Sequence, residues 1–95
     1  MKIGNAIKEL RTQKEIKQGD LANRIGISQT SLSLIESGIK QPSQETLKKV
    51  CDLLGIPQPF IYYLALEESD IPENKRNLYK VLEPKLKMEI KDLFV

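Results

Sequence analysis

The sequence of 95 residues contains no histidine and no tryptophan, and Cys51 is its one cysteine. Without an imidazole there is no histidine base and no histidine-containing metal site. A single thiol cannot form an internal disulfide, which is typical of a chain kept in a reducing cytoplasm. Cys51 lies on the apolar stripe of an expected helix, where a buried structural thiol is the default. The sequence also lacks a Gly-rich phosphate loop, so it predicts neither an enzyme nor a bound cofactor.

Long apolar runs are absent as well. No stretch approaches the roughly 18–20 apolar residues that span a bilayer, and the N-terminus lacks the apolar core of a signal peptide. Fifteen Lys and Arg side chains against thirteen Asp and Glu side chains leave a net charge of only +2. Residues 1–56 hold nine basic and six acidic side chains, a balance of +3, whereas residues 57–95 hold six and seven, a balance of −1. The sequence therefore predicts a cytoplasmic protein, not a membrane protein, with its positive charge in the first part.

What the chain does contain is a helix-turn-helix pattern over residues 18–37. Gly26 supplies a residue that tolerates positive φ, and Ser28 is a good N-cap for the helix that follows. Leu32 and Ile35 give that second helix an inward stripe. The first helix has three apolar residues at helical spacing, Leu21, Ala22 and Ile25. Two short helices joined by a tight turn are expected here.

The second helix of this pair, residues 28–37, has a largely polar outward face. A helix with Gln, Thr and Ser on its exposed side, held at a steep angle by a partner helix, is suited to reading base edges in a major groove. Many all-helical domains contain such a pair without touching DNA, so the pair alone leaves DNA binding open. The outward residues are Gln29, Thr30, Ser31, Ser33 and Leu34.

Three further helices are expected around this pair. A first helix ends near residues 12–14, a fourth runs from the N-cap Ser43 to Gly55, and a fifth covers residues 56–66. No segment shows strand alternation. The sequence thus predicts an all-α fold, with a five-helix helix-turn-helix domain over residues 1–66. The stripe of the first helix consists of Ile3, Ala6, Ile7 and Leu10.

A C-terminal helical extension is expected over residues 67–95, after an acidic connector. Residues 74–82 read as one helix. Pro84 is expected to begin another short helix, because the residue before a proline is pushed out of the α region. The apolar residues of this extension are a candidate dimerisation or partner surface, although they could instead cover the core of the monomer. The proposed anchors are Leu78, Leu82, Leu86, Ile90 and Phe94.

Several segments over residues 3–66 resemble the phage-repressor (Cro/cI, or XRE) helix-turn-helix family. The resemblance implies a repressor-like fold and a sequence-specific DNA-binding transcriptional regulator. It does not extend to the C-terminal segment. The residues that carry it are IGNAIKELR (3–11), Gln18 with Leu21-Ala22, IGISQTSLSLIESG (25–38), Pro42-Ser43 with Glu45-Thr46-Leu47, and LLGIP (53–57).

Four residues match base-reading positions of that family. Gln29 stands at the first reading position, where a Gln amide can pair with adenine N6 and N7 and discriminate by roughly 1–3 kcal/mol. Thr30 and Ser33 offer hydroxyl groups. Leu34 departs from the polar residue common in relatives and is expected to touch a thymine methyl, or else to pack on a partner or on the C-terminal tail.

The resemblance also implies phosphate contacts around the pair. In relatives the residue matching Gln18 contacts a backbone phosphate and can brace the first glutamine of the recognition helix. Arg11 and Glu36 match a structural pair that joins the first helix to the end of the third. The predicted phosphate contacts are Lys17, Gln18, Arg11, Ser37, Lys40, Gln41 and Ser43.

Three departures from the family pattern lie beside these positions. Glu15 replaces a favoured Gly, and Lys17 replaces the usual Thr N-cap, a loss that typically costs about 1 kcal/mol. Ile39-Lys40-Gln41 stands where relatives often carry three basic residues. The two changes before the pair leave the local turn geometry open but not the fold, and we expect weaker phosphate attraction after the pair.

The predicted partner is double-stranded DNA, bound by a homodimer. Two recognition helices about 34 Å apart would then read a near-palindromic site. The alternative is a protein-interaction module of the same fold, such as an antitoxin or a coactivator, using the C-terminal helices. The low net charge, the apolar Leu34 and the apolar tail favour this alternative.

Overall fold

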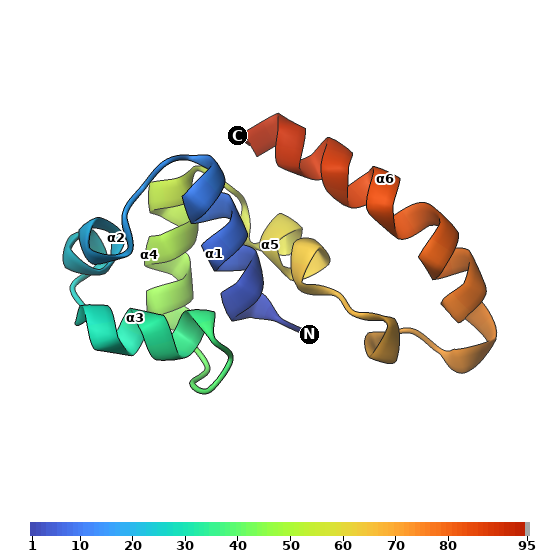
Figure 1. Cartoon of the computed structure of the whole chain (residues 1–95), viewed down its shortest axis with the longest axis horizontal. Helices are drawn as coiled ribbons and strands as arrows, with labels where there is room; N and C mark the ends of the chain where they lie inside the picture. The colour runs from blue at the N-terminus through green and yellow to red at the C-terminus, as the bar shows by residue number, and fades with distance from the viewer. Residues whose placement is uncertain (95) are drawn as a thin grey trace.

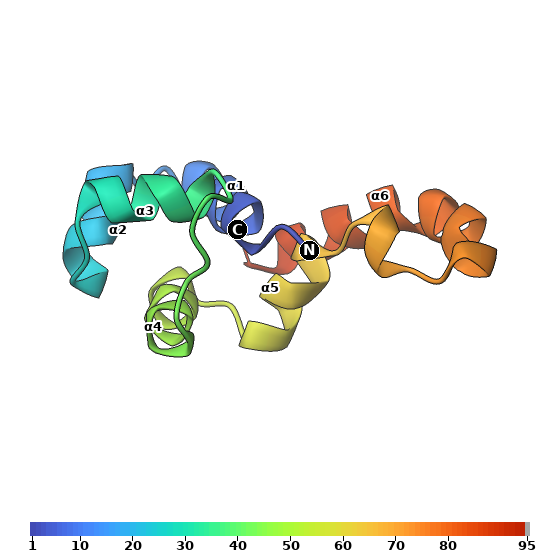
Figure 2. The same cartoon turned by 90° about the horizontal axis from the view of Figure 1, so that it is seen from below.

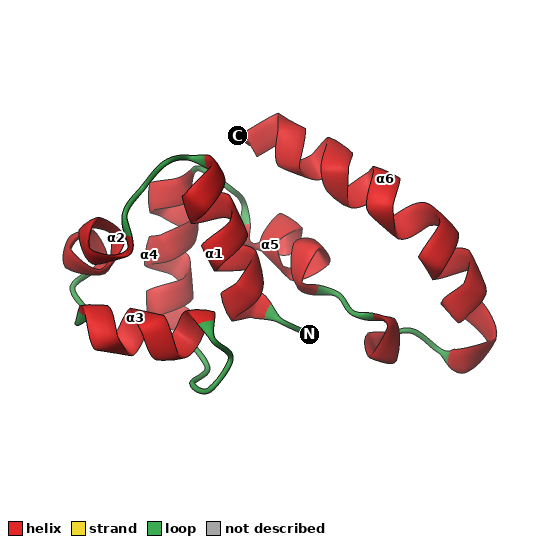
Figure 3. Cartoon of the chain, in the orientation of Figure 1, coloured by secondary structure: helices red, strands yellow, loops and turns green. Residues whose placement is uncertain are grey.

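The computed structural model describes residues 1–94 as a set of helices joined by short connections (Figure 1). No strand occurs in this range, so the expected all-α fold is confirmed (Figure 3). The elements in order are α1 (Ile3–Gln13), α2 (Gln18–Ile25), α3 (Gln29–Glu36), α4 (Gln44–Leu54), α5 (Gln58–Ala65), the 3-10 turns η1 (Glu68–Asp70) and η2 (Glu73–Lys75), and α6 (Arg76–Phe94).

The first five helices form two layers, which Figure 2 shows edge-on. α1, α2 and α3 lie in one layer, and α4 and α5 lie beneath them. The molecule measures 42 × 26 × 18 Å, with α2 and α3 at one end of the long axis and α6 at the other. The helix-turn-helix pair is therefore well separated from most of the C-terminal helix.

One apolar core lies between the two layers. It is built from the helical stripes of α1 to α5, as the spacing predicted, and each large side chain buried in it contributes roughly 1.5–3 kcal/mol. Its members are Ala6, Ile7, Leu10, Leu21, Ala22, Ile25, Leu32, Ile35, Leu47, Val50, Cys51, Leu54, Ile56, Ile61, Leu64 and Ala65.

The helix ends follow the local capping rules in most places. Ser28 and Ser43 accept hydrogen bonds from the backbone N–H groups of the residues three positions later, at 3.0 and 3.1 Å. Gly55 is left-handed at φ 70° and ends α4. Lys17 makes no side-chain cap, and Glu15 adopts φ 57°, a left-handed conformation that favours glycine. The turn before α2 thus places Glu15 in the left-handed conformation that suits the glycine it replaces, and α2 begins without a side-chain cap.

Gly4 permits a close crossing of α1 over α3. It is buried in the first turn of α1, directly against the backbone of α3. A Cβ at this position would overlap the carbonyl oxygen of Ile35 and press on the backbone of Glu36. The crossing therefore depends on a residue without a side chain.

The prediction that Pro84 begins a new helix is wrong. α6 continues through it from Arg76 to Phe94. A proline inside a helix removes one N–H and crowds the preceding turn, at a cost of about 3 kcal/mol. Contacts on both sides of Pro84 offset this cost: the Tyr79 hydroxyl and the Lys87 ammonium group both donate to the carbonyl oxygen of Leu66.

The apolar residues of α6 divide into two groups. Ile90 and Phe94 pack on the core, and the Phe94 ring lies 5.1 Å from the ring of Phe60, centroid to centroid. The others remain exposed: Val81, Met88 and four leucines, which we call the leucine stripe, Leu78, Leu82, Leu86 and Leu93. Ile90 and Phe94 thus cover the core, as one alternative for the tail expected, and the exposed leucines leave the other alternative, a dimer or partner surface, as a prediction.

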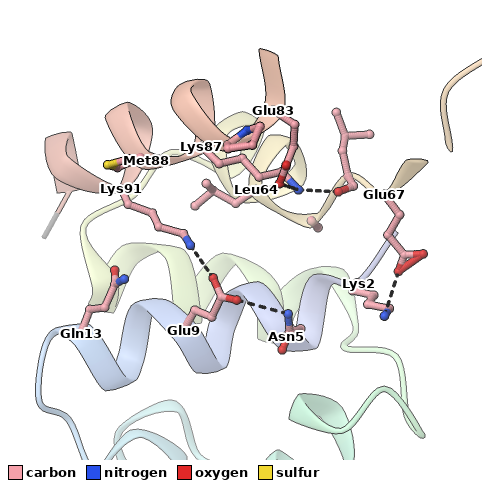
Figure 4. A pocket seen from close by; sticks show the side chains of 13 residues that line it. Lys2, Asn5, Glu9, Gln13, Leu64, Glu67, Glu83, Lys87, Met88 and Lys91 are labelled. Atoms are coloured by element: carbon pink, nitrogen blue, oxygen red, sulfur yellow. Dashed lines mark hydrogen bonds and ion pairs between the residues drawn. The ribbon is translucent and has the colours of Figure 1, made fainter. Parts of the chain in front are cut away.

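A polar groove separates α6 from α1 (Figure 4). Lys91 spans it to Glu9 at 2.7 Å, and Asn5 donates to the same Glu9 carboxylate at 3.4 Å. Together with the contacts at Leu66, these polar bonds hold α6 on the body. None of the helices described is both long and apolar enough to cross a membrane.

Candidate nucleic-acid interface

The turn between α2 and α3 fixes the angle of the pair. Gly26 adopts φ 76°, and the N–H of Ile27 donates to the carbonyl oxygen of Ala22 at 3.0 Å. Ile27 is half-buried and packs against the core. These contacts confirm the role expected for Gly26 and hold α3 across the end of α2.

One face of α3 is buried and the other is exposed. Leu32, Ile35 and Glu36 face the core, which holds the helix in place. The outward face looks away from the second layer (Figure 2). All four predicted base-reading residues are exposed on it: Gln29, Thr30, Ser33 and Leu34.

A buried ion pair ties α1 to the end of α3. Arg11 Nε donates to Glu36 Oε2 at 2.8 Å, and Arg11 Nη2 donates to Oε1 at 3.0 Å. The side chains of Arg11 and Glu36 are only 11% and 2% exposed. The expected structural pair is therefore present, in a bidentate geometry that holds both groups rigidly.

The same carboxylate positions the start of α2 and, through it, the start of α3. Gln18 Nε2 donates to Glu36 Oε1 at 3.0 Å, and Gln29 Nε2 donates to Gln18 Oε1 at 3.4 Å. The side chain of Gln29 is thus held by a hydrogen-bond chain that begins at Arg11. The geometry shows the brace between Gln18 and Gln29 that the family resemblance implied.

The predicted phosphate contacts differ in which donors are already used. Arg11 Nη1 donates to the carbonyl oxygen of Ile16 at 2.8 Å, so all three of its nitrogens are engaged within the protein. The Ser37 hydroxyl donates to the carbonyl oxygen of Leu34 at 3.0 Å, and the Ser43 hydroxyl to Oγ1 of Thr46 at 2.9 Å. This geometry favours a structural role for these three side chains.

The remaining candidates lie at the surface around the pair. Lys17 and Gln41 are exposed, and Gln18 is half-buried at the first position of α2. Lys40 is exposed, and its ammonium group donates to the Ser31 hydroxyl at 3.0 Å. This contact places a positive charge beside the middle of α3.

Cys51 has the burial that its position in the sequence predicted. It is 4% exposed within the core. Burial, with a smaller contribution from the neighbouring Asp52, raises the pKa of the Cys51 thiol to about 11. The thiol is therefore neutral and shielded near pH 7, and structural in role.

Two glycines that matter here were not identified from the sequence. Gly4 allows α1 to approach α3, and Gly19 lies under the amide of Gln29, where a Cβ would be 3.2 Å from Gln29 Oε1. Glycine within an expected helix is the only signal that sequence offers for such positions, because Ala is otherwise favoured there.

Comparison with known proteins identifies the family to which this chain belongs. A family model described as helix-turn-helix (HTH_3) matches residues 7–57, more than half of the chain. The ImmF control region 10 kDa protein of Bacillus phage phi105 is 40% identical over 55 residues, which are 58% of this chain and 61% of that protein. The chain thus spans about three-fifths of that relative. It belongs to this helix-turn-helix family of DNA-binding transcriptional regulators.

Two further relatives extend past the helix-turn-helix pair. The cryptic phage CTXphi transcriptional repressor RstR of Vibrio cholerae is 26% identical over 93 residues, which are 98% of this chain and 82% of that repressor. The immunity repressor protein of Bacillus phage phi105 is 30% identical over 95 residues, covering 87% of this chain and 66% of that protein. Similarity to both therefore includes part of the C-terminal segment.

Proposed function

We propose that this chain is a sequence-specific transcriptional repressor that inserts α3 into the major groove of double-stranded DNA. The observation that carries this proposal is the exposed face of α3 with Gln29 braced by Gln18. A side chain held before binding loses less conformational entropy when it meets a base. Base contacts are proposed for Gln29, Thr30, Ser33 and Leu34.

Phosphate contacts are proposed for the four candidates that lie at the surface around the pair: Lys17, Gln18, Lys40 and Gln41. Gln18 begins α2, where free backbone N–H groups and the helix dipole favour an anion. Lys17 precedes it, and Lys40 and Gln41 follow α3 on the other side. Four contacts on two sides of α3 would fix its register along the duplex.

We propose further that the chain binds DNA as a homodimer in the cytoplasm, with the DNA-binding unit at residues 1–66 and the dimer surface in residues 67–95. The exposed leucine stripe of α6 supports this assignment. Sedimentation of the full chain and of residues 1–66 provides the test. The full chain should sediment as a dimer and the shorter chain as a monomer; an unchanged oligomeric state would rule out the assignment.

Selection from a randomised DNA pool tests the proposed function itself. The wild type should enrich a near-palindrome with half-sites about one helical turn apart. Gln29→Ala should lose preference at one position in each half-site. Gln13→Ala is a matched control, because Gln13 lines the groove facing α6 rather than the face of α3. Enrichment of no sequence at moderate salt would contradict the proposal and favour a protein-binding module.

A further inference from the structure

The amide of Gln29 lies directly over Gly19, the second residue of α2. A Cβ on Gly19 would stand 3.2 Å from Gln29 Oε1 and 3.6 Å from Gln29 Cδ. The first of these distances is shorter than ordinary van der Waals contact, so the amide would have to move. A side chain at position 19 would therefore displace the Gln29 amide by a few tenths of an ångström.

The hydrogen bond that braces Gln29 has little room for such a movement. Its donor and acceptor, Gln29 Nε2 and Gln18 Oε1, are already 3.4 Å apart. Hydrogen bonds weaken rapidly beyond this separation, so a shift of a few tenths of an ångström away from α2 would break the brace. Gln18 itself cannot follow, because its Nε2 is bonded to the buried carboxylate of Glu36 at 3.0 Å.

We propose that Gly19 is a specificity-determining positioning residue, whose missing side chain sets the position of the Gln29 amide for base reading. This inference rests on the proposed function, since it concerns how α3 reads DNA. A bidentate contact needs both the oxygen and the nitrogen of the amide in the plane of the base edge. Gly19 acts through Gln29 and needs no contact with a base.

The substitution Gly19→Ala distinguishes an effect on base preference from an effect on the stability of the fold. Replacing a helical glycine by alanine ordinarily stabilises a protein, so Tm should rise by about 2 to 8 °C. A bidentate Gln–adenine pair discriminates by roughly 10- to 100-fold, and Gly19→Ala should reduce the preference at that base pair by at least about 3-fold. A variant that is more stable yet less specific would not be explained by damage to the fold.

Two controls show whether a change in base preference in Gly19→Ala acts through Gln29. Asn23→Ala also places alanine at an exposed position of α2, one turn further along the helix than Gly19, and should leave specificity unchanged. In a Gln29→Ala background, Gly19→Ala should have no further effect on base preference. If Gly19→Ala instead weakens binding to all sequences equally, or acts fully in that background, it obstructs a phosphate and the proposal is wrong.

A measurement without DNA keeps this inference separate from the proposed function. The side-chain amide signals of Gln29 in the NMR spectrum of the free protein should shift in Gly19→Ala and stay in place in Asn23→Ala. Unchanged signals in both variants would overturn the role of Gly19. If the wild type selects no DNA sequence at all, the function in DNA reading fails whatever the Gln29 signals do.

Discussion

At the scale of single residues, Gly4 sets how closely α1 and α3 cross. Gly4 lies there against the backbone of Ile35 and Glu36, with no space for a Cβ. The helices that position Gln18 and Gln29 therefore depend on a residue that contributes no side chain of its own.

Gly4→Ala tests this point. Helix propensity alone predicts a gain of roughly 0.5–1 kcal/mol. We expect instead a loss of more than about 2 kcal/mol, because the added carbon overlaps backbone atoms that cannot rotate away. Thermal and urea unfolding measure the change, with Lys8→Ala at an exposed position of α1 as a control. An unchanged or higher Tm for Gly4→Ala would contradict the expected overlap.

Glu36 is the second residue on which the pair depends, since it holds both Arg11 and Gln18. Glu36→Ala should destabilise the fold by about 3 to 5 kcal/mol, because it leaves a buried guanidinium group without its partner. The matched control is Glu45→Ala, which removes an exposed ion pair with Lys49 and should cost less than about 1 kcal/mol. Urea unfolding of both variants makes the comparison, and equal losses would show that burial of the pair is unimportant.

At the scale of elements, α6 is the one whose course was predicted wrongly. Local rules treat Pro84 as a boundary, and they are sound for an isolated segment. The helix continues because Tyr79 and Lys87, on either side of Pro84, are both bonded to the carbonyl oxygen of Leu66. Contacts from outside the helix thus hold its two halves in one line.

Pro84→Ala should therefore strengthen α6 without changing its course. Restoring the missing N–H and relieving the crowded turn should increase helix stability by about 1 to 3 kcal/mol. Circular dichroism at 222 nm and amide hydrogen exchange along α6 provide the readout. Slower exchange confined to α6 is expected; loss of helix would mean that the proline is needed for the observed course.

On the scale of the whole molecule, the two ends of the long axis expose different kinds of side chain. The α2 and α3 end holds Lys17 and Lys40, and the α6 end holds the leucine stripe. With a net charge of only +2, long-range attraction to DNA is weak, and specific contacts must supply more of the affinity. The proposed functions of the two ends fit this division.

The salt dependence of DNA binding tests the proposed phosphate contacts. Lys40→Ala should weaken binding at all sequences by a similar factor and reduce the slope of log K against log salt by about 1. Lys48→Ala, at an exposed position of α4 in the layer opposite α3, should leave the slope unchanged. Binding isotherms between low and physiological salt make the measurement, and equal slopes for Lys40→Ala and the wild type would remove Lys40 from the interface.

The sequence by itself determined the features that depend on neighbouring residues. The apolar spacing defined the five helices and their buried faces, Ser28 and Ser43 defined two helix starts, and Gly26 defined the turn. Each of these follows from backbone geometry and capping within a few residues. The outward face of α3, including Gln29, could be read in the same way.

Only the tertiary structure decided the features that depend on residues far apart in the chain. It engaged every side-chain nitrogen of Arg11 and carried α6 through Pro84. It also placed Gly4 where a Cβ would overlap backbone atoms, and Gly19 where a Cβ would press on the Gln29 amide. Spacing along a sequence cannot show these results, because each arises from the distance between two elements after they pack. The glycines are the clearest case, since what they contribute is space, and space between helices exists only in the folded chain.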